Sequence, residues 1–193
     1  MTGPNESVVA PFGPGVPTSG GEARRSKAEM ERAIAGHRTD VYRFALKLVG
    51  RRADADDVTQ TVLLEALRGI DRFQGASTLL TWMKGIAINV VRSTARRQRY
   101  HVPLEDELAG TIAGPANTES SAADRIELSR VEATLRAMPA EFREAIVAVC
   151  LDGMRYDEAA HALGVPIGTI RSRVARGRAI LIARVRGEEG RRP

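Results

Sequence analysis

Two stretches of the sequence carry several arginine or lysine side chains and no acidic residue. Residues 84–103 contain five basic side chains: Lys84, Arg92, Arg96, Arg97 and Arg99. Residues 159–187 contain six: Arg171, Arg173, Arg176, Arg178, Arg184 and Arg186. Without carboxylates among them these charges repel one another, and phosphate groups as partners would relieve that repulsion. Arginine outnumbers lysine, which suits bidentate recognition of phosphates and base edges. The chemistry that both stretches predict is nucleic-acid binding.

A helix-turn-helix pattern overlaps the second basic stretch, at residues 156–174. Gly164 permits the positive φ of a tight turn between two helices. The spacing of four apolar residues predicts a small shared core: Leu163, Val165, Ile170 and Val174. The remaining side chains would then face outward, as on a recognition helix in a major groove: Thr169, Arg171, Ser172, Arg173 and Arg176. A helical hairpin whose arginines are merely solvated is the alternative interpretation.

Other kinds of chemistry find little support in the sequence. One cysteine and three histidines among 193 residues exclude a disulfide framework and a multi-cysteine zinc site. We find no Ser/His/Asp set, no pair of carboxylates typical of a catalytic pocket, and no phosphate-binding glycine loop, so we expect neither an enzyme nor a cofactor or metal. No apolar run approaches the roughly 20 residues that cross a bilayer, and no secretory signal is visible. We therefore expect a cytoplasmic protein without membrane insertion.

The elements that must position these residues are helices. Apolar residues recur at helical spacing over 28–49, 54–68, 78–98, 128–138, 139–150, 156–163 and 167–185, and no segment alternates long enough for a strand. We predict an all-α chain in which Ser77 caps the helix over 78–98. We also expect Trp82 to lie in the core and Cys150 to pack on an apolar helix stripe rather than to sense redox state.

Composition divides the chain into two small helical domains. Residues 1–27 are rich in Gly and Pro and predict a disordered tail. The domains span 28–100 and 124–187, and residues 188–193 form a second tail. The predicted flexible linker, 101–123, begins an acidic segment, since residues 104–127 hold six acids and one base. The modest net charge of +5 thus combines two basic helices with an acidic connection.

Two groups of three motifs, taken in order, resemble the extracytoplasmic-function (ECF) type of bacterial RNA polymerase sigma factor. In the first domain they are DADDVTQ at 54–60, FQGAS at 73–77 and WMKGIAIN at 82–89. In the second they are MPAEFREA at 138–145, GMRYDEAA at 153–160 and GTIRSRVARGR at 168–178. The resemblance implies a sigma region two domain over 28–100 and a sigma region four domain over 124–187.

The resemblance also implies which residues meet which partner. Core RNA polymerase would bind Asp54, Asp57, Gln60 and Leu64. The minus-ten promoter element would be bound by the loop at 73–77 and the following helix, through Phe73, Gly75, Ser77, Lys84, Asn89, Arg92, Arg96 and Arg97. Region four in this family reads the minus-thirty-five element, which assigns that role to Thr169, Arg171, Ser172, Arg173 and Arg176.

The function so implied is transcription initiation: binding core RNA polymerase, directing it to specific promoter DNA and aiding promoter melting. The resemblance leaves open whether an anti-sigma factor is a further partner. The alternative is a helix-turn-helix transcriptional regulator whose N-terminal helical domain senses a ligand or dimerises. A second basic helix behind a loop such as 73–77 favours the sigma factor.

Overall fold

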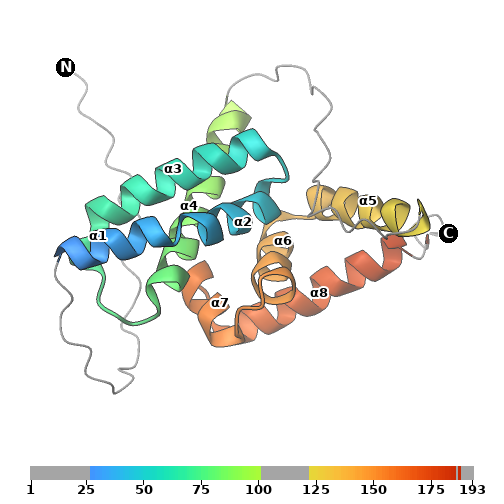
Figure 1. Ribbon diagram of the computed structural model, residues 1–193. Helices are drawn as coiled ribbons and strands as arrows, with labels where there is room; N and C mark the ends of the chain where they lie inside the picture. The colour runs from blue at the N-terminus through green and yellow to red at the C-terminus, as the bar shows by residue number, and fades with distance from the viewer. Residues whose placement is uncertain (1–26, 101–121, 186, 188–193) are drawn as a thin grey trace.

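Helices are the regular elements of the chain wherever the structure describes it. A computed structural model describes residues 27–100, 122–185 and 187 (Figure 1), which confirms the all-α prediction for these residues. The helices of the first domain are α1 (Lys27–Gly36), α2 (Arg38–Val49), α3 (Arg52–Gly69), the 3-10 turn η1 (Ile70–Arg72) and α4 (Leu79–Tyr100). Those of the second are α5 (Ala122–Ala137), α6 (Ala140–Ile146), the π-helical turn η2 (Val147–Leu151), α7 (Tyr156–Leu163) and α8 (Ile167–Val185).

The predicted tails and linker fall almost entirely outside the described residues. The two exceptions are Lys27, which begins α1, and residues 122–123, which begin α5. None of the helices that the structure describes is long and apolar enough to cross a membrane.

The core of the first domain lies where α2, α3 and α4 meet. Phe44, Val62 and Met83 are completely buried there, one from each of the three helices. Ile34 of α1 closes the same core. Gly50 ends α2 with φ at 76° and donates its N–H to the carbonyl of Leu46 at 2.9 Å. This left-handed glycine turn ends α2 before α3 begins.

The single helix predicted over 28–49 is wrong, because the chain breaks into α1 and α2 at His37. The backbone of His37 has φ −85° and ψ 3°, the bridge region between helix and strand. Its N–H is shared between the carbonyls of Ala33 and Ile34, both at 3.2 Å. Gly36 comes just before the break and is a weak helix former. Apolar spacing continued across the break and therefore hid it.

The helix α4 begins one residue later than predicted, because Thr78 and not Ser77 supplies its cap. The backbone N–H of Thr81 donates to Oγ1 of Thr78 at 3.1 Å, which is the N-cap hydrogen bond. The hydroxyl of Ser77 donates instead to the carbonyl of Thr78 at 3.3 Å. Two neighbouring hydroxyl residues satisfied the same sequence signal, so the choice between them was not determined.

The helix-turn-helix of the second domain has the predicted turn and core. Gly164 adopts φ 67° at the end of α7, and the N–H of Val165 donates to the carbonyl of Ala160 at 3.1 Å. This is the hydrogen bond of a Schellman turn. Leu163, Ile170 and Val174 are buried, and Val165 packs against them while partly exposed.

The segment predicted as one helix up to Cys150 widens into the π-turn η2. The N–H of Asp152 bonds to the carbonyl of Val147, five residues earlier, at 2.9 Å. This wider turn rotates the chain, so Cys150 is exposed and the prediction that it packs in the core is wrong. Its Sγ accepts a hydrogen bond from Nη2 of Arg178 at 3.5 Å.

Glu132 on α5 is a buried carboxylate whose protonation should affect stability. Burial raises its pKa, and Arg136, at 3.7 Å, lowers it by less. A carboxyl with a raised pKa in the fold favours the folded state when it is protonated, and this contribution is lost as pH rises through the raised value. Glu132→Gln should therefore gain stability relative to the wild type as the pH rises from below the ordinary pKa of glutamate through the raised pKa of Glu132. Urea unfolding across this range, with Glu141→Gln as the exposed control, measures the trend; a difference that shrinks with pH contradicts it.

The two domains lie against each other. Helix α4 of the first domain packs on α7 of the second, and α2 reaches the turn η2. In Figure 1, α7 lies directly below α4, while α8 runs away from this contact toward α5. The arrangement brings basic side chains of the first domain to acidic side chains of the second.

Candidate nucleic-acid interface

The N-terminal half of α8 presents the predicted recognition residues. Arg171, Ser172 and Arg176 are exposed, while Thr169 and Arg173 are partly buried. The N–H groups of Thr169 and Ile170 donate to the carbonyl of Pro166, the residue just before α8. These two hydrogen bonds start the helix. Ile170, buried completely, holds the opposite face of α8 in the core. This anchoring leaves the arginines free to reach base edges and phosphates.

The basic stretch on α4 divides into two parts. Arg96 and Arg97, at its C-terminal end, are exposed. Lys84 and Arg92 are turned toward the second domain, and their side chains are 12% and 34% exposed. Asn89 lies between the two and is partly buried. No carboxylate lies near Lys84 or Arg92 in the sequence, but the fold brings one to each of them from the second domain.

Lys84 meets Asp152 at the end of the turn η2. The Nζ of Lys84 lies 2.5 Å from Oδ2 of this carboxylate, and Nζ of Lys47 on α2 lies 3.0 Å from Oδ1. Lys47 also donates to the carbonyl of Leu151 at 2.9 Å. The ammonium of Lys84 is 5.7 Å from the ring centroid of Phe44, within cation–π range. Asp152 thus joins two helices of the first domain to the second.

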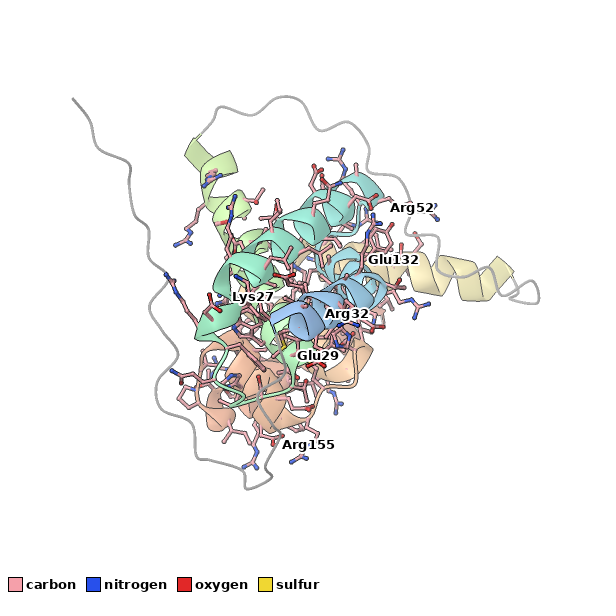
Figure 2. The ribbon with its side chains drawn as sticks, turned by 60° about the vertical axis from the view of Figure 1, so that its left-hand side comes forward. Lys27, Glu29, Arg32, Arg52, Glu132 and Arg155 are labelled. Carbon is pink, nitrogen blue, oxygen red and sulfur yellow. The ribbon has the colours of Figure 1, made fainter. Side chains whose placement is uncertain are left out.

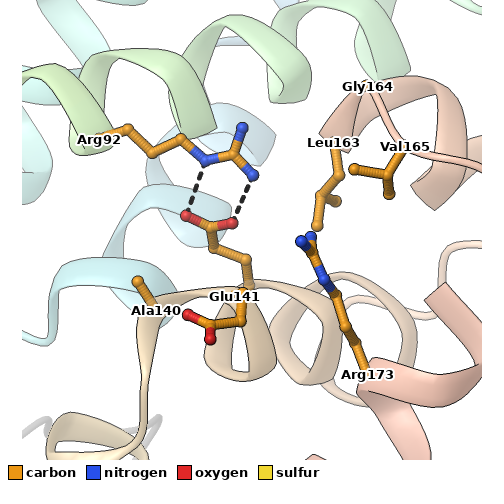
Figure 3. A pocket seen from close by; sticks show the side chains of 8 residues that line it. Arg92, Ala140, Glu141, Leu163, Gly164, Val165 and Arg173 are labelled. Atoms are coloured by element: carbon orange, nitrogen blue, oxygen red, sulfur yellow. Dashed lines mark hydrogen bonds and ion pairs between the residues drawn. The ribbon is translucent and has the colours of Figure 1, made fainter. Parts of the chain in front are cut away.

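Arg92 meets Glu144 of α6 in a two-point ion pair (Figure 3). Its Nε lies 3.0 Å from one carboxylate oxygen and its Nη2 lies 2.6 Å from the other. Glu144 is 4% exposed. A pocket of about 380 Å³ adjoins the pair, with Arg173 on its far side. A predicted minus-ten residue and a predicted minus-thirty-five residue therefore line one pocket between the domains.

The loop at 73–77 leads into α4 and is held by aromatic packing. The rings of Phe73 and Trp82 lie 5.2 Å apart, centre to centre, at 43°. Trp82 is partly buried against the core and also covers Gly69, as the predicted packing role requires. Gly75 is exposed with φ 71° and Ser77 is partly buried. The loop offers an open backbone beside a fixed aromatic pair.

A third surface lies along α3. Asp57, Gln60 and Leu64 are exposed, and Asp54 is partly buried, 3.7 Å from Arg51. Leu64 is 53% exposed and its neighbour Leu67 is 40% exposed. Figure 2 shows Arg52, at the start of this helix, at one edge of the molecule and Arg155, at the start of α7, at another. An exposed leucine pair beside acidic side chains is typical of a protein-binding surface.

The sequence did not predict the ion pairs that join the first domain to the second. Glu144, Asp152 and Lys47 were not among the predicted site residues, because their ion pairs join positions 52 to 105 residues apart. One local signal was present: Lys84, Ile88 and Arg92 follow at four-residue spacing, so all three lie on one face of α4. The apolar Ile88 between the two cations indicates a covered face, and the structure shows Ile88 completely buried.

No group of three or more His, Cys, Asp or Glu side chains is placed to hold a metal ion within the described ranges. The side chains that gather at the surfaces described above offer charge, hydrogen-bonding groups and apolar contact. The arrangement suits two nucleic-acid surfaces, on α4 and α8, and one protein-binding surface on α3.

Two family matches cover most of the described residues. Residues 33–100 match the family described as Sigma-70 region 2, and residues 128–181 match Sigma-70, region 4. The matched ranges lie within the predicted domains.

Similar proteins carry related names. The chain is 33% identical over 179 residues to the RNA polymerase sigma factor HrpL of Pseudomonas syringae pv. syringae, covering 91% of this chain and 93% of that protein. It is 37% identical over 140 residues to the ECF RNA polymerase sigma factor EcfG of Rhodopseudomonas palustris, covering 72% of this chain and 76% of that one.

Two solved structures share the fold. The sigma factor RpoE from Bartonella quintana, crystallised with the anti-sigma factor NepR, superposes with a TM-score of 0.68 at 27% identity, over 82% of this chain and 97% of that one. CnrH, in complex with the cytosolic domain of CnrY, superposes with a TM-score of 0.58 at 25% identity, over 81% and 92%.

Proposed function

Since the chain belongs to the ECF type of the sigma-70 family, whose members direct RNA polymerase to promoters, we propose how its three surfaces divide that work. Helix α3 binds core polymerase, the loop at 73–77 with α4 binds and opens the minus-ten element, and α8 reads the minus-thirty-five element. The observation that carries this assignment is one exposed basic surface on each domain, with a separate apolar and acidic surface on α3. We assign the protein to the cytoplasm, where its polymerase acts, and assign it no catalytic step.

The minus-ten role rests on the loop at 73–77. Opening a promoter requires a base to leave the stack, which costs a few kcal/mol that protein contacts must offset. Gly75 presents an exposed backbone, and Ser77 is partly exposed two residues further on, with its hydroxyl donating to the carbonyl of Thr78 at 3.3 Å. Phe73 is fixed against Trp82 at 5.2 Å, so the loop is held before DNA arrives. Arg96 and Arg97 lie further along α4, where phosphates of the separated strand would pass.

The minus-thirty-five role rests on α8. Arg171 and Arg176 are exposed on a helix whose other face is buried through Ile170 and Val174. An arginine that pairs bidentately with guanine discriminates by roughly 1–3 kcal/mol against a wrong base.

The test of the proposal is transcription with purified core polymerase. The polymerase, with and without this protein, is given a pool of promoter fragments, and the 5′ ends of the run-off products are sequenced. We expect initiation at a small set of sites that share two spaced elements. Permanganate should detect unpaired thymines at the minus-ten element of the same templates. No protein-dependent initiation would refute the proposal, and DNA binding without core polymerase at operator-like sites would favour the helix-turn-helix regulator instead.

The arginines should differ in what they contribute. Arg171→Ala or Arg176→Ala should relax specificity at single positions of the minus-thirty-five element, by about tenfold per position. Arg96→Ala should weaken binding to every promoter by about the same factor. The slope of log binding constant against log salt concentration should become smaller in magnitude by about one. Competition binding of the holoenzyme to a library of promoter variants measures both effects. Uniform losses from all three variants would contradict the division of roles.

The two solved structures are complexes with NepR and with CnrY. By analogy, we propose that an anti-sigma factor binds this chain. Pull-down from native lysate, followed by mass spectrometry, would identify polymerase subunits and any such partner together.

A further inference from the structure

We propose that Asp152 and Glu144 hold the free chain closed by occupying, on α4, the basic groups that would otherwise meet DNA phosphates. The inference rests on the proposed function for the DNA-facing role of Lys84 and Arg92. It goes beyond that function by giving the free protein a second state, in which its two domains mask each other. Binding to promoter DNA then requires the two carboxylates to be displaced.

The first support is the geometry of the ion pairs. Arg92 presents two N–H groups to Glu144, at 3.0 and 2.6 Å, as a guanidinium does to a phosphate. Lys84 contacts Asp152 at 2.5 Å. The carboxylate side chains are only 9% and 5% exposed, so water screens these pairs less than it screens surface pairs. Both cations are therefore engaged while the chain is closed.

The second support is Gly85, which lies beside Lys84 in the middle of α4. A Cβ built at Gly85 would lie 3.1 Å from the carbonyl oxygen and 3.4 Å from the Cα of Ala162, which provides the three nearest atoms. Glycine weakens a helix interior, and no neighbour within the first domain is among those three. Its small size matters for contact with α7, so the closed arrangement is built into α4 itself.

The third support is that closure reaches both DNA-facing surfaces. Arg173 of α8 lines the same pocket as Arg92 and is partly buried. Arg171 and Arg176 remain exposed on the same helix. Closure therefore removes Lys84 and Arg92 from the minus-ten surface and restricts Arg173 on the minus-thirty-five surface. Arg171 and Arg176 can still make the first contact with DNA.

The test is to neutralise both carboxylates and observe the free chain. Asp152→Asn with Glu144→Gln keeps the shapes, removes the two ion-pair partners and leaves Lys84 and Arg92 in place. Dyes on Glu65→Cys in α3 and Ala179→Cys in α8, in a Cys150→Ser background, report the separation of the domains by energy transfer. The control, Asp157→Asn with Asp40→Asn, adds the same charge at pairs within single domains: Asp157 pairs with Arg155 at the outer edge (Figure 2), and Asp40 with His37.

We expect low transfer efficiency in the neutralised variant and high efficiency in the wild type and control. Affinity for a duplex of mixed sequence should rise about tenfold above that of the control, because a binding-competent state that is scarce reduces apparent affinity in proportion to its population. Transfer efficiency equal to the control would overturn the closed state. An open chain with no gain in DNA affinity over the control would overturn the competition with phosphate.

A second variant guards against a change in folding. Gly85→Leu changes no charge and should strengthen α4 as a helix, while its side chain cannot fit against Ala162. It should open the chain as the neutralised variant does, with circular dichroism unchanged; a closed Gly85→Leu chain counts against the proposal. These readouts need neither polymerase nor a promoter. If the neutralised variant opens while the unmodified chain gives no run-off product, the proposed function is refuted and the closed state is not.

Discussion

Replacing Leu64 with aspartate is expected to lower the affinity of the chain for core RNA polymerase by at least about tenfold, equal to about 1.4 kcal/mol. Leu64 is 53% exposed on α3, beside the exposed Leu67 and among the acidic side chains that we propose as contacts. Exposed apolar side chains at the centre of an interface commonly dominate its binding energy. A carboxylate at this position would be buried without a partner when the complex forms.

The fold should tolerate the change, because the side chain of Leu64 does not enter the core. Ala133→Asp is the matched control, since it places the same carboxylate on an exposed helical position of α5. Titration of labelled core polymerase with each variant measures the affinity, and thermal melting confirms that both fold. If Leu64→Asp and Ala133→Asp bind polymerase equally well, α3 is not the contact surface.

Gly177→Ala is expected to destabilise the second domain, although alanine is the better helix former by about 1 kcal/mol. A Cβ at this position of α8 would lie 2.6 Å from Cγ1 of Ile146 and 3.4 Å from the carbonyl oxygen of Phe142. Ile146 is 1% exposed, so it has little room to move, and overpacking of this kind costs roughly 1–3 kcal/mol. Chemical denaturation measured by circular dichroism gives the difference.

Gly168 in the same helix provides the control. A Cβ there meets nothing within 4 Å, so Gly168→Ala should be neutral or stabilising by up to about 1 kcal/mol. Ile146→Ala removes the atoms that collide with Cβ at Gly177, so the double variant Gly177→Ala, Ile146→Ala should lose less stability than the two single losses combined. Additive losses, or a stabilising Gly177→Ala, would mean that α6 and α8 pack less closely than described.

Local patterns were sufficient for the helix-turn-helix. The spacing of Leu163, Ile170 and Val174 and the glycine at 164 predicted its turn and core, because each signal acts within a few residues. The outward position of Arg171 and Arg176 followed from the same periodicity, since the inward positions determine the outward ones. The binding role of Leu64 came from the family resemblance and not from periodicity, and its exposure is compatible with that role.

Long-range pairing was not available to sequence reasoning. The distribution of charge along the sequence placed Lys84 and Arg92 on one helix without acidic residues. It says nothing about carboxylates that are distant in sequence. Their carboxylate partners come from another domain, and no local periodicity encodes which helix face meets which. Smaller local effects explain the other two errors. Ser77 and Thr78 both satisfied the cap signal, and apolar spacing continued across the break at His37.

The π-turn η2 carries one residue more per hydrogen-bonded turn than the α-helix that it continues. Each residue of a helix turns the chain by about 100°, so that extra residue decides which side of the second domain faces its neighbour. Asp152, which ends the turn, is directed toward the lysines, and Cys150 toward solvent. A chain one residue shorter here could keep the core of α6 and α8 but would present a different side to α4. The length of a single turn therefore decides whether the carboxylate of Asp152 can reach the two lysines of the first domain.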